Sequence, residues 1–321
     1  MKLISSTCLL AAAAMSSTGV AATDVAVYRG MCDASAAAAL GADHFVVADD
    51  EHNTLLIYRR GQTSPVGSTP LAAFLGTKND KESDIEGAAE VGERIYWIAS
   101  HGRNSKGKER KERHRLFATE RVPGAAPPQL RPVGTPYATL LEDLLAADAL
   151  KPYNLSAASQ RAAEAQDGLN IEGLAATPDG RLLIGFRNPV PRGRALIVTL
   201  ENPSEVVAGA RARLGAPFEL DLGGLGIRSI ERIGSSYLVV AGPPADTGSF
   251  ALYRWSGAAG APATRVTAIA FDSLRPEALL GIPGTPSVQI LSDDGGVRTD
   301  GIECKDRPVA ERAFRSITIK P

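Results

Sequence analysis

The chain has 321 residues, a formal net charge of −1 and an aromatic content of 5%. A nearly neutral chain has no bulk attraction for nucleic acid or for an anionic membrane surface. So few aromatic residues also argue against a platform on which bases stack. We therefore expect no nucleic-acid partner, and the length suffices for one large hydrophobic core or for two domains.

The first residues have the pattern of a signal peptide. A lysine precedes an apolar run over residues 3–15, and small residues follow up to Ala22. The run is too short to span a bilayer, and the small residues fit a cleavage site after Ala22. Cys8 lies inside the run, but its neighbours do not suit lipid attachment. We predict a signal peptide over residues 1–22 and a periplasmic or secreted mature chain, residues 23–321, without a membrane span.

Two cysteines, Cys32 and Cys304, remain in the mature chain. Export permits a disulfide, and an even number of cysteines near the two ends of the chain favours one. The alternative is a pair of buried free thiols. We predict a Cys32–Cys304 disulfide.

A short motif that contains Ile-Glu-Gly recurs along the chain. Its clearest copies are residues 84–89 and 170–175. Weaker copies lie at residues 229–233 and 275–279, and residues 32–37 resemble a degenerate first copy without the glutamate. Each copy is followed by a turn and an apolar strand, and then by a polar loop and a further strand. The expected strands are residues 45–48, 55–58, 95–98, 116–119, 182–185, 196–199, 237–240, 251–254, 288–291 and 316–319.

Five units of about four strands each are typical of the blades of a β-propeller. We predict an all-β fold with a single propeller of five four-stranded blades, or six if two units have been merged. The fifth unit ends after its third strand, whereas residues 24–28 form a spare strand at the start. We expect that strand to complete the last blade and close the ring, because closure removes exposed sheet edges.

A helical pattern interrupts the series between the two clearest motif copies. Residues 140–145 and 157–166 are predicted helices, the second with Ser156 as its cap. We interpret residues 138–167 as a small insert between blades two and three. It should lie on the same face as the motif acids, where it could cover the channel.

Strand direction alternates within a blade, so the motif residues and the loops between the second and third strands should share one face. Carboxylates that gather there repel one another unless they are protonated, paired with arginine or neutralised by a cation. Oxygen ligands suit Ca²⁺, and no His/Cys cluster has the spacing of a zinc site. The alternative is that the acids brace the blades through hydrogen bonds to backbone amides. The predicted Ca²⁺ ligands are Glu86, Glu172, Asn170 and Asp49, and other acids expected on this face include Asp33, Asp84, Glu231 and Glu277.

Seven basic residues crowd the segment 103–115, against two acids. On the channel face this loop would attract an anionic substrate such as a phosphate ester, or it is a solvated mobile loop. His101 and Arg103 begin the loop at a strand end and are the predicted catalytic residues, although a single histidine is more often structural. The predicted substrate-binding residues are Asn104, Lys106 and Arg187.

Several of these segments together resemble a bacterial group known as domain of unknown function 3616. They are residues 32–37, 45–51, 84–87, 97–104 and 170–174, and the resemblance covers nearly all of the mature chain. More loosely, the repeated Glu-Gly is similar to that of calcium-dependent gluconolactonase and phytase-like propellers, which are hydrolases with a divalent metal in the channel. Only the motif acids match, so this second likeness implies metal-dependent hydrolysis by analogy of fold.

Two hypotheses of function follow. The first is an exported, metal-dependent hydrolase of a phosphate ester, a lactone or another ester, in which Ca²⁺ would polarise the substrate or activate water. The second is a non-catalytic scaffold whose rigid face binds an acidic partner. Either way we expect a monomer that binds a small anionic molecule or a component of the cell envelope.

Overall fold

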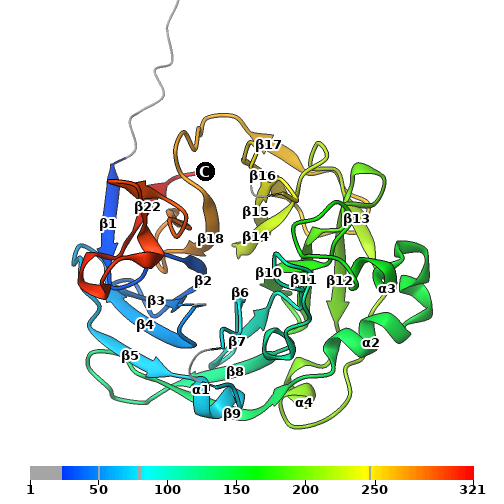
Figure 1. The fold of residues 1–321 in the computed structure, drawn as a ribbon, viewed down its shortest axis with the longest axis horizontal. Coiled ribbons are helices and arrows are strands. Elements are labelled where there is room, and N and C mark those ends of the chain that lie inside the picture. The colour runs from blue at the N-terminus through cyan, green and yellow to red at the C-terminus, as the bar shows by residue number, and fades with distance from the viewer. Residues whose placement is uncertain (1–23, 50, 79–80, 246) are drawn as a thin grey trace, which may run out of the picture.

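Five four-stranded antiparallel sheets surround a central axis in the computed structural model, which describes residues 24–49, 51–78, 81–245 and 247–321. The view down the shortest axis shows the sheets as blades of a β-propeller, with β2, β6, β10, β14 and β18 nearest the centre (Figure 1). The prediction of an all-β propeller with five blades is confirmed. The predicted signal peptide lies outside the described residues.

Each of the first four blades is built from four strands that follow one another in the chain. Blade one is β2 (Ala34–Ala39), β3 (His44–Asp49), β4 (Thr54–Arg59) and β5 (Gly67–Pro70). Blade two is β6 (Ile85–Val91), β7 (Arg94–Ala99), β8 (Leu116–Arg121) and β9 (Leu130–Tyr137). Blade three is β10 (Asn170–Ala176), β11 (Leu182–Asn188), β12 (Ala195–Leu200) and β13 (Phe218–Leu220). Blade four is β14 (Gly226–Ile233), β15 (Ser236–Gly242), β16 (Ala251–Trp255) and β17 (Thr264–Val266).

Blade five closes the ring with strands from both ends of the chain. Its order is β18 (Pro276–Gly281), β19 (Val288–Ser292), β22 (Ala313–Ile319) and β1 (Val25–Arg29). The first and last strands pair antiparallel, from Val25 opposite Ile317 to Arg29 opposite Ala313. The spare amino-terminal strand therefore completes the last blade, as the sequence predicted. A short hairpin of β20 (Arg298–Thr299) and β21 (Ile302–Glu303) interrupts this blade before β22.

The hydrophobic core lies between neighbouring blades. Where blade five meets blade one, the buried rings of Tyr28, Phe45, Tyr58 and Phe314 contact one another with centroids 5.0–5.5 Å apart. Between blades three and four, a Cβ added at Gly173 would lie 2.7 Å from Ile227 Cγ2. This close approach explains why the motif carries glycine directly after its glutamate.

Short helices decorate the loops. Residues 140–145 are helical as predicted, within α2, but the second predicted helix is wrong, because α3 ends at residue 158 and turns follow it. No helix among the described residues is long and apolar enough to cross a membrane. The helices are α1 (Ala72–Leu75), α2 (Leu140–Ala146), α3 (Leu155–Ala158) and α4 (Pro203–Val206), with 3₁₀ turns η1 (Lys111–Arg113), η2 (Asp148–Tyr153), η3 (Pro191–Gly193), η4 (Cys304–Asp306) and η5 (Val309–Glu311).

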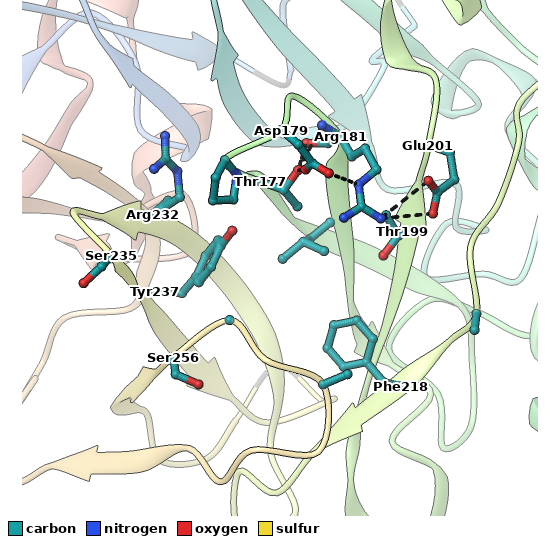
Figure 2. A pocket seen from close by; sticks show the side chains of 15 residues that line it. Thr177, Asp179, Arg181, Thr199, Glu201, Phe218, Arg232, Ser235, Tyr237 and Ser256 are labelled. Atoms are coloured by element: carbon teal, nitrogen blue, oxygen red, sulfur yellow. Dashed lines mark hydrogen bonds and ion pairs between the residues drawn. The ribbon is translucent and has the colours of Figure 1, made fainter.

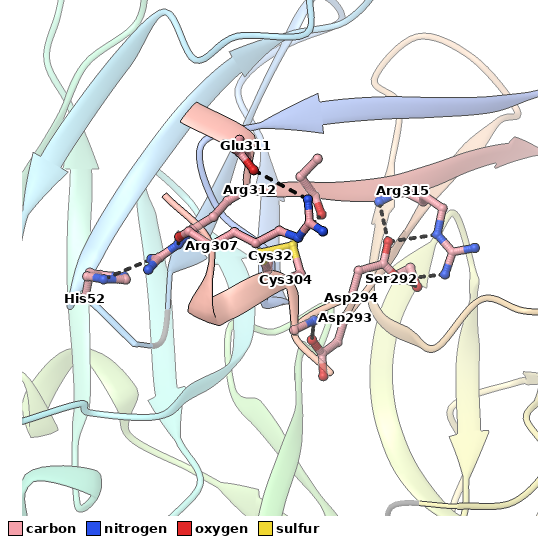
Figure 3. The surroundings of a disulfide bond; sticks show 12 residues. Cys32, His52, Ser292, Asp293, Asp294, Cys304, Arg307, Glu311, Arg312 and Arg315 are labelled. Atoms are coloured by element: carbon pink, nitrogen blue, oxygen red, sulfur yellow. Dashed lines mark hydrogen bonds and ion pairs between the residues drawn. A yellow bond between two sulfur atoms is a disulfide. The ribbon is translucent and has the colours of Figure 1, made fainter. Parts of the chain in front are cut away.

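The predicted disulfide is present. Cys32 and Cys304 are bonded, with their Cα atoms 5.9 Å apart and a sequence separation of 272. Figure 3 shows the bond beside the loop that precedes β22, next to Asp293 and Asp294. The backbone N–H of Asp294 donates to the Cys32 carbonyl at 3.0 Å, so the bond reinforces a contact between the start of blade one and blade five.

Loss of this disulfide should destabilise the protein without changing its fold. The loop that it closes is long, and the chain-entropy account assigns such a cross-link about 5 kcal/mol as an upper value. We expect Cys32→Ala to lower the melting temperature, and a reductant to lower that of the parent but not that of the variant. Scanning calorimetry with and without reductant measures both. Equal melting temperatures for oxidised parent and variant would contradict the prediction.

Candidate functional site

Each innermost strand has a register break that leaves one of its residues without an opposite residue, and β10 has a further break between Asn170 and Ile171. In β6 the partner of Ile85 is Ala99 and that of Gly87 is Ile98, so Glu86 has no opposite residue. The other four innermost strands break in the same way near their starts. A bulge of this kind changes the direction in which the side chain of the extra residue points. The five bulged residues, one per blade, are Ser35, Glu86, Glu172, Arg228 and Glu277.

These five side chains are called here the channel ring, and contacts between blades join four of them across the axis. Arg228 of blade four donates from Nη1 to Glu277 of blade five at 2.7 Å and to Glu172 of blade three at 3.1 Å. Ser35 Oγ of blade one donates to Glu277 at 3.3 Å. Four of the five blades are therefore joined by direct contacts across the channel.

Glu172 is the most heavily engaged acid of the channel ring. Its side chain is 2% exposed and accepts from Arg187 Nη1 at 2.9 Å and from Asn170 Nδ2 at 2.9 Å, besides Arg228. Two guanidinium groups and an amide thus stabilise one buried carboxylate, as a buried charge requires.

Glu86 stands apart from these contacts. Among the residues that the structure describes, none forms a hydrogen bond or ion pair with its carboxyl group. Burial, together with the negative charges of Glu172 and Asp84, raises its pKa well above the ordinary value. The opposing charge of Arg187 offsets only part of this effect. Glu86 therefore keeps its proton to a higher pH than an ordinary glutamate does.

A cavity of about 410 Å³ opens beside Glu86 at one end of the channel. Six carboxyl groups and four cationic groups contribute to its lining, so acids outnumber bases. Its walls come from blades one, two, three and five and from the segment after α3, which supplies Ala163 and Glu164. The lining residues are Asp33, Glu51, Glu82, Asp84, Glu86, Arg103, Asn104, Ser105, Arg113, Ala163, Glu164, Asn170, Arg187 and Lys305.

Asn170, one of the lining residues, has a buried acceptor atom without a partner in the described part of the chain. The residue is 3% exposed, its amide nitrogen donates to Glu172, and its Oδ1 atom has no hydrogen-bond partner among the described residues. A buried acceptor without a partner costs free energy. A donor group on a bound molecule would satisfy it.

The arginines of the cavity are already engaged. Arg113 pairs with Glu82 and, at 2.8 Å, with Asp84. Arg103 donates from Nε to the Ser159 carbonyl at 2.8 Å and also contacts Gln160, which ties the basic loop to the helical insert. The basic segment that the sequence indicated is thus partly a set of structural contacts.

A pair of aspartates, Asp33 and Asp293, lies at the cavity edge, next to the disulfide. Asp33 and Asp293 are neighbours, and burial raises the pKa of each to about 7. Nearby Glu51 raises the pKa of Asp33 further, whereas Lys305 opposes the shift. This pair holds a proton into the neutral pH range.

His101 is buried and is not among the residues that line the cavity. The ring is 2% exposed, its Nδ1 donates to the Ala99 carbonyl at 2.7 Å, and it stacks on His114 at 5.7 Å. Burial, together with His114, lowers the pKa of His101 to about 3, so the ring is neutral at physiological pH. Its catalytic role remains a prediction, and its contacts are those of a packed side chain.

The four predicted Ca²⁺ ligands do not meet in one place. Glu86 and Asn170 both line the cavity, but the Glu172 oxygens are occupied by Arg187 and Arg228. Asp49 lies outside the cavity lining, 3.0 Å from the His52 ring. The described residues also contain no group of three or more His, Cys, Asp or Glu side chains arranged for a metal ion. These residues do not fit a four-ligand site, and Ca²⁺ binding remains a prediction.

Two of the three predicted substrate-binding residues line the cavity, and the third does not. Asn104 and Arg187 line the cavity, whereas Lys106 is exposed outside it. Asn104 Oδ1 accepts from the backbone N–H groups of Lys106 and Lys108, at 3.2 and 2.8 Å. These bonds stabilise the conformation of the loop that carries Asn104.

Sequence reasoning missed Arg228 and misplaced Glu231. The weak motif copy in blade four was aligned at residues 229–233, but the bulge falls three residues earlier than Glu231, at Arg228. Glu231 lies farther along β14 (Gly226–Ile233), outside the channel ring. The signal that could have identified Arg228 is Ile227-Arg228-Ser229, which repeats the apolar, polar, small order of Ile85-Glu86-Gly87.

Fold and site together define a β-propeller with a polar, acid-rich cavity at one end of its channel. The chain belongs to the family described as protein of unknown function (DUF3616), which matches residues 33–123 and 135–286.

Solved structures with a similar fold share little sequence. The PQQ-bound aldose sugar dehydrogenase of Streptomyces coelicolor is 12% identical with a TM-score of 0.45, over 92% of this chain and 99% of that one. An exo-β-1,3-galactanase of Phanerochaete chrysosporium is 10% identical with a TM-score of 0.48, over 92% and 63%. A luciferin-regenerating enzyme is 7% identical with a TM-score of 0.44, over 92% and 95%. No curated protein matches the chain, and likenesses this distant carry no argument about activity.

Removing Arg228 should strongly destabilise the protein. Arg228→Met would leave Glu172 and Glu277 buried with fewer partners, and breaking a buried ion pair in this way costs about 3–5 kcal/mol. Denaturant unfolding at pH 7 measures the loss. Adding Glu277→Gln to the variant should restore part of it, because one unpaired charge is removed. Equal stability of parent and Arg228→Met would show that the channel ring does not hold the blades together.

Stability should fall as pH rises from about 5 to 8. Burial raises the pKa of Glu231 from 4.5 to about 8. The folded state therefore holds this proton more tightly than the unfolded chain, and the resulting stabilisation is full below pH 4.5 and lost toward pH 8. Each such group contributes a slope of about 1.4 kcal/mol per pH unit.

Glu231→Gln isolates one contribution to this slope. The amide does not titrate, so the variant should lose stability less steeply than the parent when unfolding is measured across this pH range. The same change at Glu93, which is exposed in the turn between β6 and β7, is the control and should leave the slope unaltered. If Glu231→Gln lost stability with rising pH as steeply as the parent does, the raised pKa of Glu231 would be ruled out.

Proposed function

We propose that this protein is an exported hydrolase that opens an uncharged ester or lactone in the cavity at the channel mouth. The observation that carries the proposal is Glu86, a cavity carboxyl with a raised pKa and no hydrogen-bond partner among the described residues. A carboxyl group whose pKa is raised toward the working pH can serve both as a base and as an acid.

The reaction needs one proton carrier. In its ionised form Glu86 would take a proton from a water molecule as the water oxygen attacks the substrate carbonyl carbon. The proton would then pass from Glu86 to the leaving alkoxide as the carbon–oxygen ester bond breaks. Water and ester are consumed, an acid and an alcohol are formed, and Glu86 returns to its starting state. Asn170 Oδ1, which lacks a partner, would accept from a hydroxyl group of the substrate and orient it.

The charge of the cavity supports an uncharged substrate over a phosphate ester. Acids outnumber bases in the lining, and both Arg103 and Arg113 are committed to protein groups. A phosphate would have to compete with Glu82 and Asp84 for Arg113. A neutral molecule with hydroxyl groups instead finds acceptors at Glu86 and Asn170.

Two features support export. The disulfide requires an oxidising compartment, since cytosolic thiols are normally kept reduced. The amino-terminal pattern over residues 1–22 suits a signal peptide.

The test is turnover of lactones, carboxylic esters and phosphate esters by purified protein, with Ca²⁺ or with a chelator. We expect activity on an uncharged lactone or ester that rises with pH as Glu86 ionises. Glu86→Gln should reduce kcat by about 10²–10⁴-fold, the usual contribution of a general acid–base group. Glu90→Gln is the matched control: it makes the same change on the same strand, where Glu90 pairs with Arg121 outside the cavity, and it should retain activity.

Other outcomes discriminate between the hypotheses. Turnover that survives in Glu86→Gln would remove the proposed role of Glu86. Activity restricted to phosphate esters would contradict the uncharged substrate, and activity abolished by the chelator would favour the metal-dependent hypothesis. Tight binding of a ligand in the cavity without any turnover would favour the non-catalytic scaffold.

A further inference from the structure

A second cavity, of about 630 Å³, lies between blades three and four at the opposite end of the propeller from the channel mouth. It is bounded by the turn that joins β10 to β11 and by the end of β12. The turn between β14 and β15 and the loop that follows β16 complete the boundary. Figure 2 shows Thr177, Asp179 and Arg181 on one wall, with Arg232 and Ser235 across from them. No residue of the channel-mouth cavity contributes to it.

Aromatic and aliphatic groups form one side of this cavity. Phe218 and Tyr237 line it together with Leu183. Both rings pack on Trp255 beneath, at centroid distances of 5.5 and 5.2 Å. Tyr237 also donates from its hydroxyl to the Ala176 carbonyl at 3.0 Å, which fixes the ring in place. The apolar surface is therefore rigid and already formed.

Paired polar groups form the other side. Arg181 donates from Nε to Asp179 at 2.8 Å and from Nη1 to Glu201 at 3.3 Å, and Thr177 Oγ1 donates to Asp179 at 2.5 Å. Arg232, on the facing wall, makes the charged groups of the lining two arginines and two acids. The cavity as a whole is thus electrically balanced while it offers both donors and acceptors.

We propose that this second cavity binds a neutral saccharide unit. A sugar ring has an apolar face of C–H groups, which packs on aromatic rings, and an edge of adjacent hydroxyl groups that both donate and accept. Arg181 with its two acids supplies complementary donors and acceptors side by side, already oriented for such an edge. The lining has equal numbers of cationic and anionic groups, so it offers no net attraction for a charged ligand. The volume is within the range of small-molecule sites.

This proposal is independent of the reaction at the channel mouth. A saccharide site on the opposite end would hold the protein on a glycan while the channel mouth faces away from it. Its chemistry also fits an envelope component as the partner.

The test is titration calorimetry of the purified protein with neutral trisaccharides of glucose, galactose and mannose, and with a uronic-acid trisaccharide as the charged comparison. We expect at least one neutral probe to bind and the charged one to bind more weakly. Arg181→Met should weaken binding at least tenfold, and Ser256→Trp, which adds a bulky ring to an exposed lining position, should abolish it.

Two controls make the result specific. Arg131→Met changes an exposed arginine that pairs with Glu120 on blade two, away from the cavity, and should leave the affinity unchanged. Glu86→Gln should also bind as the parent does, whatever its effect on turnover. The proposal is overturned if no neutral probe binds, if the charged probe binds best, or if the two lining variants, shown to be folded by circular dichroism, bind like the parent.

Discussion

The arrangement of charges around the axis depends on one constraint: five sheets must share a narrow channel. Each innermost strand relieves this crowding with a bulge that turns a single side chain inward, and the small residue that follows lets the next blade approach. The five inward side chains then have to be mutually compatible. Arg228 between Glu172 and Glu277 is the central solution, because one guanidinium group neutralises acids from two neighbouring blades.

The same ring explains why Glu86 is chemically distinct. Contacts run from blade one through blades five and four to blade three, and they stop before blade two. Glu86 therefore meets the negative charge of Glu172 with only partial compensation from Arg187, and holding a proton lowers that repulsion. The gap in the contacts of the channel ring and the raised pKa of Glu86 therefore have the same cause.

Much of the fold could be predicted from the sequence, because blade strands are local apolar runs and the motif repeats in chain order. The closing strand was predictable as well, since one strand was spare and one blade was short. The site was harder. Arg228 was missed because its blade keeps only the order of residue sizes and not the Ile-Glu-Gly letters, and a bulge shifts register in a way that periodicity does not reveal.

The partners of the basic loop were equally hidden from the sequence. In the sequence, nothing near Arg103 and Arg113 indicates a partner for either charge. In the fold, Arg103 donates to a backbone carbonyl of the insert, and Arg113 pairs with two acids of blade two. Such pairings join residues far apart in sequence, so only the folded arrangement distinguishes a charged surface from a set of internal braces.

The pairing of β1 with β22 has a consequence for how the chain is made. The first strand to emerge during synthesis can find its partner only after nearly every other residue has followed, because that partner ends at Ile319. Until then blade five has an open edge, and the aromatic cluster around Tyr28 lacks Phe314. Contacts between distant parts of a chain form slowly. If the chain crosses a membrane with its amino terminus first, β1 would stay unpaired until β22 had also crossed. The aromatic cluster around Tyr28 would then be completed last.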